Sequence, residues 1–239
     1  MFEFKYGFPH EEKNVLILSS RKMCLHMQKQ DPIKQPEGKL AQVTGNEVHI
    51  DPELHYDDWA DSYDKELLGE YGYSAHEIGA KALAETQLSF DSPILDVGCG
   101  TGLAGLELSR LAYTVIDGLD VSAGMLEHAR NQGIYRQLFQ KRIGVDPLSE
   151  LAGYKGVLCV GSFGLGHMEH KDIISLLDLA AANASIVIFM NAEPFYAQNY
   201  KATIERLSLD GLWKVEAIED HNYMSKLERP GKLIVGRRV

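Results

Sequence analysis

Three glycines at alternate positions, Gly98, Gly100 and Gly102, follow a short apolar run in the segment PILDVGCGTGLAGLELS, residues 93–109, and an apolar helical pattern comes after them. A strand that ends in such a loop and turns into a helix gathers backbone N–H groups and the positive helix end at one point, where an anion can bind. Glycine is needed there because a Cβ would block the ligand or the required positive φ. The same spacing also occurs in ordinary tight turns, so the neighbouring residues must decide between the two interpretations.

Two aspartates supply that context. Asp96 closes the first expected strand just before the loop, and Asp120 closes the next one. A carboxylate at the second position is well placed to accept two hydrogen bonds from the vicinal hydroxyls of a ribose. Asp117 competes for this role, but Asp120 stands directly ahead of the expected helix cap. The pattern therefore predicts a nucleoside site with Asp120 as the ribose ligand.

The loop also distinguishes between two cofactors that carry an adenosine. The dinucleotide fingerprint is G-x-G-x-x-G, whereas this loop has the spacing of Gly98, Gly100 and Gly102 and an aspartate two residues ahead of the first glycine. Asp96 would repel a pyrophosphate, but it could help to hold an ammonium group while the loop amides take a carboxylate. S-Adenosyl-L-methionine (SAM) offers both groups in its amino-acid tail, so SAM fits this loop better than NAD.

Alternating short apolar runs and helical patterns must position these residues, and they predict an α/β domain with a largely parallel sheet. Ser74 and Ser122 are expected at N-cap positions, and Gly211 is expected to end the last helix. The expected strands are residues 94–97, 114–119, 137–140, 157–161, 185–190, 213–218 and 232–239, the last two as an antiparallel pair. The expected helices are residues 57–70, 74–87, 103–111, 122–131, 172–182 and 196–207.

The composition fits one globular domain of 239 residues, with 45% hydrophobic and 24% charged residues. The net charge of −10 resides mainly in residues 51–91, which carry two basic and eleven acidic residues. A phosphate backbone would be repelled by that segment, so long nucleic acid is not an expected partner. A small neutral or cationic ligand fits better.

No apolar run approaches the roughly 20 residues that span a bilayer, and the N-terminal residues lack the apolar stretch of a signal peptide, so we expect a cytoplasmic protein without a membrane partner. Cys24, Cys99 and Cys159 are odd in number and far apart, which predicts reduced thiols rather than disulfides. His167 and His170 have no third ligand at a suitable spacing, so no metal is expected. The sequence gives no prediction of oligomeric state.

Several motifs together resemble the class I SAM-dependent methyltransferases, whose first motif reads as ILDVGCGTG does here. More narrowly, YDDWADSYDKEL, ILDVGCGTGLAG, IDGLDVSAGMLEHAR, YRQLFQ and VGSFGLGHM are similar to the methyltransferase-like family named for the Williams-Beuren syndrome chromosome region. The resemblance runs from about Tyr56 to the end. It implies a Rossmann-like seven-stranded sheet of order 3-2-1-4-5-7-6, the seventh strand antiparallel, with helices on both faces.

The resemblance also implies the cofactor, SAM, with S-adenosylhomocysteine (SAH) as product. It places the loop glycines near the methionine part and Met125 near the adenine, although a methionine there also fits an ordinary helix core. The methyltransferase domain is expected at residues 51–239, with a helical lid at about 51–91 and an extension of unclear structure at 1–50. The expected cofactor contacts are Tyr56, Trp59, Tyr63, Asp96, Gly98, Cys99, Gly100, Gly102, Asp120, Val121, Met125 and Gly161.

The lid segment YDDWADSYD has two interpretations. Aromatic faces of Tyr56, Trp59 and Tyr63 could stabilise a sulfonium cation, and the acids would favour a cationic ligand. Alternatively, Trp59 and Tyr63 form the core stripe of an amphipathic helix whose acids are solvated. Trp59 and Tyr63 share a face in either case.

One position departs from the family pattern. Similar sequences end the third strand with an Asp that accepts the adenine amino hydrogen, but Arg142 stands here, and arginine has no acceptor. Either Asp146 or a backbone carbonyl supplies the bond, or packing alone holds the adenine, or cofactor binding is weakened. We expect Asp146 or backbone carbonyls to serve and Arg142 to point to solvent.

These observations predict a methyltransferase that acts on a small or medium-sized soluble acceptor at N, O or C. The alternatives are a non-catalytic protein that binds SAM or SAH and, with less support from the loop, an NAD-dependent oxidoreductase. His167 is a weak candidate for a general base, because a lone histidine is more often structural. Acceptor specificity is expected in residues 1–56, in the lid and in residues 161–169 and 191–200.

Overall fold

The computed structural model describes residues 36–44, 51–164, 167–227 and 229–239, and all of them lie within one compact unit. The expectations for most of residues 1–50, including Cys24, lie outside this described part. Within it, no helix has both the length and the apolar character that a bilayer crossing requires.

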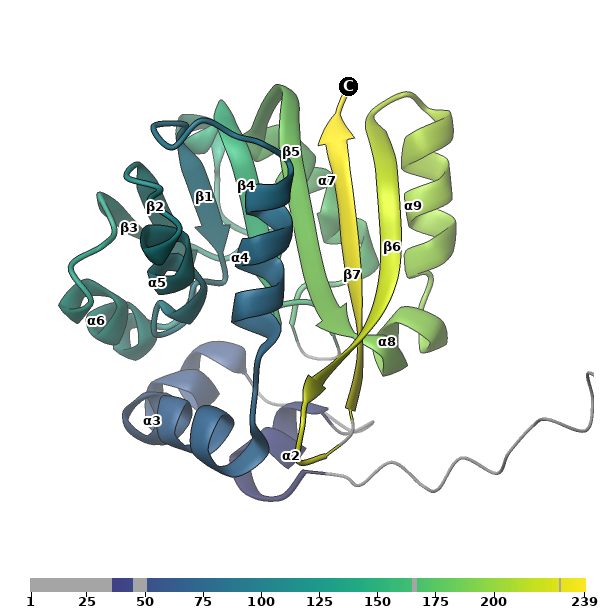
Figure 1. The fold of residues 1–239 in the computed structure, drawn as a ribbon. Helices are drawn as coiled ribbons and strands as arrows, with labels where there is room; N and C mark the ends of the chain where they lie inside the picture. The colour runs from purple at the N-terminus through teal and green to yellow at the C-terminus, as the bar shows by residue number, and fades with distance from the viewer. Residues whose placement is uncertain (1–35, 45–50, 165–166, 228) are drawn as a thin grey trace, which may run out of the picture. The chain divides into compact units, whose positions relative to one another are not determined.

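The described residues form one seven-stranded sheet of order β3-β2-β1-β4-β5-β7-β6 (Figure 1). Its five neighbouring strands from β3 to β5 pair in parallel, whereas β7 runs antiparallel to both β5 and β6. The strands are β1 (Ile94–Val97), β2 (Ile116–Asp120), β3 (Gln137–Gln140), β4 (Tyr154–Val160), β5 (Ala180–Asn191), β6 (Trp213–Met224) and β7 (Arg229–Arg238). The predicted fold class, strand order and antiparallel seventh strand are confirmed.

Helices cover both faces of this sheet, and Figure 1 shows α4 in front of it and α7 behind it. The helices are α2 (Gly38–Thr44), α3 (Pro52–Asp64), α4 (Ala75–Glu85), α5 (Leu103–Arg110), α6 (Ala123–Asn131), α7 (Ile173–Leu179), α8 (Ala192–Ala197) and α9 (Tyr200–Leu209), with a π-helix η2 (Lys65–Tyr71) and short 3-10 turns η3 (Ser149–Leu151) and η4 (His170–Asp172).

Successive residues of the central strands build two separate cores. Leu95 and Val157 pack in the core that includes α7 and α9 residues, whereas Ile94 and Leu158 pack in the core that includes α4 and α5 residues. Successive side chains of a strand point to opposite faces, so a sheet covered on both sides needs apolar residues at every position. This requirement explains why β1 reads as a continuous apolar run up to Asp96.

Two predicted helices were wrong, and Ser74 stands at the predicted N-cap of α4 but makes no side-chain capping bond within the described chain. The helix predicted at 172–182 ends at Leu179, because Ala180 already pairs with Tyr154 of β4 and this pairing outweighs the helix preference of the alanines. The helix predicted at 196–207 is two helices, and Asn191 caps the first by accepting the Glu193 N–H at 3.3 Å.

The helices α2 and α3 lie beyond the carboxyl ends of the parallel strands, below the sheet in Figure 1. Leu40 and Val43 of α2 pack in the same apolar core as Trp59 of α3. The compact unit therefore includes a helix from the segment 1–50, whose structure the sequence left unassigned. In open α/β sheets the carboxyl ends of the strands are where ligands bind, so these helices border the expected site.

The central position of β1 leads to a prediction about stability. Leu95 is 0% exposed, whereas Leu209 at the end of α9 is 88% exposed. Leu95→Ala should lower the free energy of unfolding by about 2 to 5 kcal/mol, because it leaves a cavity in the core. The same change at Leu209 should stay within about 0.5 kcal/mol. Urea denaturation of both variants measures this, and equal losses would contradict the assignment of Leu95 to the core.

Candidate active site

The glycine loop leads from β1 into α5 with a backbone that only glycine adopts readily. The φ angles of Gly98, Gly100 and Gly102 are 67°, 54° and 97°. A Cβ on Gly98 would lie 1.9 Å from the Ser162 Oγ, whereas a Cβ on Gly100 would meet nothing within 4 Å. Gly98 is therefore required by close packing, and Gly100 faces open space where a ligand can approach the backbone.

That open space belongs to a cavity of about 300 Å³ at the carboxyl ends of β1 and β2. Eight of the twelve expected cofactor contacts line it, and they are Tyr56, Tyr63, Gly98, Gly100, Asp120, Val121, Met125 and Gly161. Four do not, and they are Trp59, Asp96, Cys99 and Gly102. The cavity therefore brings together residues from the lid helix, the glycine loop, β2, α6 and the end of β4.

Asp120 is oriented by the backbone around it. Its Oδ2 accepts the Gly100 N–H at 2.8 Å and its Oδ1 accepts the Ser122 N–H at 3.0 Å. Burial raises the pKa of this carboxyl group, and these two hydrogen bonds oppose the rise. Each oxygen keeps a further lone pair, so the group can still accept bonds from a ligand.

Asp117, the other acid of β2 that could have bound the ribose, has a structural role instead. Asp117 is buried, accepts the Tyr154 hydroxyl at 2.7 Å and the Arg136 Nε–H at 3.0 Å, and does not line the cavity. The structure therefore presents Asp120, and not Asp117, to a ligand.

Asp96 does not reach the cavity, contrary to the expectation that it would hold an ammonium group. Its Oδ2 accepts the Tyr135 hydroxyl at 2.7 Å in the interior. Burial raises the pKa of Asp96 to about 7. Asp96 therefore makes a structural hydrogen bond in the interior, behind the glycine loop.

The other three exceptions also lie behind the cavity wall. Trp59 is 0% exposed and packs edge-on against Tyr63 with ring centroids 4.8 Å apart, so it belongs to the apolar core and does not line this cavity. Cys99 is buried, and burial raises the pKa of its thiol. Gly102 is the N-cap of α5, and a Cβ there would lie 3.1 Å from the Tyr135 ring.

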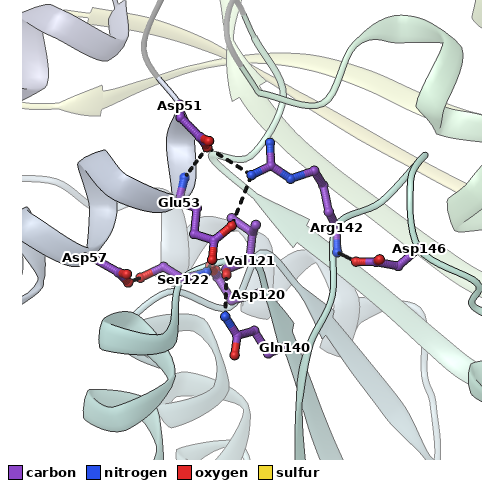
Figure 2. Close-up of polar contacts among 9 residues, drawn as sticks. All are labelled: Asp51, Glu53, Asp57, Asp120, Val121, Ser122, Gln140, Arg142 and Asp146. Atoms are coloured by element: carbon purple, nitrogen blue, oxygen red, sulfur yellow. Dashed lines mark hydrogen bonds and ion pairs between the residues drawn. The ribbon is translucent and has the colours of Figure 1, made fainter.

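Arg142 does not point to solvent as expected. Figure 2 shows its guanidinium reaching the first turn of α3, where Nη2 lies 2.9 Å from Asp51 and 3.3 Å from Glu53. Asp51 also caps α3 by accepting the Glu53 N–H at 3.1 Å. Arg142 therefore joins the loop after β3 to the start of α3. Both Arg142 and Pro52 line the cavity.

Asp146 is also not placed to accept a hydrogen bond from an adenine amino group, contrary to our expectation. Its carboxylate accepts the backbone N–H of Arg142 at 2.6 Å, which closes the turn that contains Gly144, and Asp146 does not line the cavity. Ile143, Gly144 and Val145 do line it. Their backbone is left as the candidate partner for an adenine amino group.

Carboxylates further along α3 dock the helix on its neighbours. Asp57 accepts the Ser122 Oγ–H at 2.5 Å and the Gly124 N–H at 2.9 Å, at the N-terminus of α6. Asp61 lies 3.1 Å from the His128 Nε2, and Asp64 accepts the Thr101 hydroxyl at 2.6 Å.

The spacing of these acids explains their arrangement. Positions 57, 61 and 64 fall on one helical face, and a carboxylate near a helix N-terminus is stabilised by the helix dipole. The sequence suggested solvated acids or acids that favour a cationic ligand, and it missed this docking role. The spacing of four and three residues was the available signal.

A second, smaller cavity adjoins the first. It measures about 90 Å³ and shares Tyr56, Tyr63, Gly161 and His167 with the larger one. Its own lining includes Trp59, Tyr73, Phe163, Phe189 and Tyr223, with Asn191, Glu193 and Gln198 as polar members. Asn191, Glu193 and Gln198 fall in the segment 191–200, where acceptor specificity was expected. Sequence reasoning missed Phe189 of β5 and Tyr223 of β6, because only the sheet brings these strand ends beside α3.

His167 stands between the two cavities, with its ring centroid 5.6 Å from that of Tyr56. Burial lowers the pKa of His167 to about 4, so the imidazole is neutral near pH 7 and a weak base. His170 instead contacts the Thr203 hydroxyl at 2.8 Å. Within the described residues, no group of three or more His, Cys, Asp or Glu side chains is arranged to hold a metal ion.

This sheet order, with a glycine loop after β1 and an acid at the end of β2 on one cavity, defines a class I SAM-dependent methyltransferase. A family profile described as a methyltransferase domain matches residues 94–185. The chain belongs to the family of human methyltransferase-like protein 27, with which it is 31% identical over 167 residues, covering 67% of this chain and 68% of that protein.

Solved structures share the fold at low sequence identity. Magnesium protoporphyrin IX methyltransferase from Synechocystis, solved with bound SAM, has a TM-score of 0.59 and 15% identity, covering 81% of this chain and 100% of that chain. A putative methyltransferase from Haloferax volcanii, solved in complex with the Trm112 activator, has a TM-score of 0.56 and 17% identity, covering 77% and 97%.

The cofactor of this chain is SAM, as its family and its methyltransferase neighbours indicate. The larger cavity fits such a molecule in three ways. Open space lies over the Gly100 backbone, Asp120 presents free lone pairs, and Met125 and Ile143 supply apolar wall for a ring.

The contacts of Arg142 predict that this residue slows cofactor exchange. Arg142→Ala should speed SAH dissociation and speed hydrogen exchange at the start of α3, because the helix loses its tie to the loop after β3. Arg142→Asp, which restores the family pattern, should weaken SAH binding further by setting a third acid beside Asp51 and Glu53.

Stopped-flow measurement of SAH dissociation and hydrogen exchange over residues 51–71 test this. Arg206→Ala is the control, because Arg206 of α9 pairs with Asp210, the C-cap residue of the same helix. Tighter SAH binding by Arg142→Asp would refute the role of Arg142 as a tie for the lid.

The raised pKa of Asp96 predicts a pH dependence of stability. Below about pH 4 both the folded and the unfolded chain hold this proton, and the stabilising effect is complete. As the pH rises towards 7 the unfolded chain has released the proton while the folded chain still binds it, so stability is lost over this window. Asp96→Asn should reduce the change in unfolding free energy between pH 4 and pH 7, measured by urea denaturation. Asp178→Asn, at an exposed site on α7, should leave the change as in the wild type.

Proposed function

We propose that this methyltransferase acts on a small or medium-sized organic acceptor that binds in the smaller cavity, while SAM occupies the larger one. The observation that carries the proposal is the wall that the two cavities share, formed by Tyr56, Tyr63, Gly161 and His167. SAM supplies an activated methyl group, so the protein needs to align an acceptor and exclude water rather than provide a nucleophile.

In this proposal each part of the site has a physical task. Asp120 holds the ribose, and the loop at Gly100 receives the amino-acid tail. Burial raises the pKa values of Tyr56 and Tyr63, so both phenols stay protonated and can donate hydrogen bonds at the shared wall. Since His167 is a weak base, the acceptor atom must be nucleophilic without a strong general base.

Two further observations bear on the choice of acceptor. The net charge of −10 disfavours a polyanion, and the cavity of about 90 Å³ suits a small organic group. One structural neighbour is a putative RNA methyltransferase from Pyrococcus horikoshii, with a TM-score of 0.51 and 16% identity, so RNA is the acceptor class to test against.

The non-catalytic alternative rests on two grounds, Arg142 in place of an adenine ligand and the absence of an evident general base. The second ground stands, since His167 is a weak base, but the first loses its weight. Because Arg142 pairs with Asp51 and Glu53, its presence has a structural explanation that does not require a weakened cofactor site.

The ribose assignment is tested by calorimetry. Asp120→Ala should weaken the binding of SAM and SAH by about 1.5 to 3 kcal/mol, the usual scale for hydrogen bonds to a charged group. Asp91→Ala, at an exposed position outside the cavity, should bind both as the wild type does. Unchanged affinity in a folded Asp120→Ala protein would move the ribose site elsewhere.

The acceptor class is tested with methyl-labelled SAM. The protein is incubated with separated fractions of a cell extract: small metabolites, total RNA and protein. We expect label in the metabolite fraction. Label in RNA or protein would refute the small acceptor, and no label in any fraction, despite tight SAM binding, would favour the non-catalytic alternative.

A further inference from the structure

A buried arginine lies beside the smaller cavity. Arg229 begins β7 and is 2% exposed, and none of its three guanidinium nitrogens has a hydrogen-bond partner among the described residues. A buried charge without hydrogen bonds is costly, so such groups are normally paired or bind a ligand. The guanidinium therefore has donors available for an anion.

The neighbours of Arg229 place it directly behind the cavity wall. Its Nη2 lies 3.6 Å from the Glu193 Oε2, an ion pair that is longer than a hydrogen bond. Burial raises the pKa of Tyr223 to about 12, and the charge of Arg229 and its polar contact with the Tyr223 hydroxyl limit the rise. Glu193 and Tyr223 both line the smaller cavity and do not line the cofactor cavity.

Glu193 is a loose partner for this arginine. Its side chain is 44% exposed, so it can turn into solvent at little cost, as for other exposed ion pairs. A ligand carboxylate in the cavity could then bind the guanidinium through two parallel hydrogen bonds, which is the geometry that arginine favours.

We propose that the acceptor is an apolar or aromatic carboxylic acid, whose carboxylate pairs with Arg229 in place of Glu193. This inference rests on the proposed function, because it names the substrate class of the same site. The aromatic walls at Tyr73 and Phe189 suit the apolar body of the molecule. Within the described residues, no lysine or arginine lines this cavity itself. Arg229 lies directly behind the lining residues Glu193 and Tyr223, so it is the cation that a ligand displacing Glu193 would meet.

The rival ligand is an aromatic amine that binds Glu193 directly. The two possibilities predict opposite effects of Glu193→Gln. Removing this carboxylate frees Arg229 for an acid, so the affinity for an acid should rise several-fold. For an amine the same change removes the partner charge, so the affinity should fall.

The experiment uses the full chain saturated with SAH and two probes with the same ring, 3-phenylpropionate and 2-phenylethylamine. Calorimetry should show the acid binding at least tenfold more tightly than the amine. Glu193→Gln should strengthen acid binding, and Arg229→Gln should weaken it at least tenfold, while both variants keep the wild-type affinity for SAH.

The outcomes separate this inference from the proposed function. If the wild type does not bind SAH, the proposed function fails. If SAH binds but neither probe binds at millimolar concentration, or the amine is preferred, or Glu193→Gln weakens acid binding, the anionic acceptor is refuted. Should Arg229→Gln not fold, the Glu193→Gln result alone decides, because its direction differs between acid and amine.

Discussion

Carboxylates on α3 hold this helix across the carboxyl ends of the parallel strands, and both cavities depend on that placement. Asp57 meets the Ser122 hydroxyl and the Gly124 N–H at the start of α6, and Asp64 meets Thr101 in the glycine loop. Tyr56 and Tyr63, on the neighbouring face of the helix, thereby line the larger cavity. The segment that carries most of the net charge is therefore a structural element, whose acids are matched to helix N-termini and hydroxyl donors.

Arg142 pairs with acids at the start of α3, so an ion pair also holds that end of the helix. The family resemblance implies an acid at position 142 that accepts a hydrogen bond from the adenine, whereas here a cation pairs with Asp51 and Glu53. This cation joins the loop after β3 to the start of α3. Asp146 then stabilises the turn through the Arg142 N–H, and the backbone of residues 143–145 borders the cavity.

The chemistry of the two cavities follows from their different linings. The larger one has an oriented carboxylate and open backbone, which suit a polar cofactor. The smaller one is rich in aromatic side chains, and the wall that the two cavities share carries neutral phenols and a neutral imidazole. A site of this kind favours an acceptor that needs no strong base. The buried guanidinium of Arg229 behind the smaller cavity, with Glu193 as an ion-pair partner 3.6 Å away, is the basis for our proposal of an anionic acceptor.

Apolar periodicity in the sequence predicted an α/β domain with a largely parallel sheet, because each strand-loop-helix unit carries this local signal, and the family resemblance implied the strand order. The sequence also identified Gly98, Gly100 and Asp120, which the structure gathers at one cavity. Only the tertiary structure decided which neighbours line the larger cavity: Asp96 is turned inward to Tyr135, Trp59 packs in the apolar core, and Arg142 pairs with acids about 90 positions away. Such pairings depend on how distant elements pack, and no local pattern encodes them.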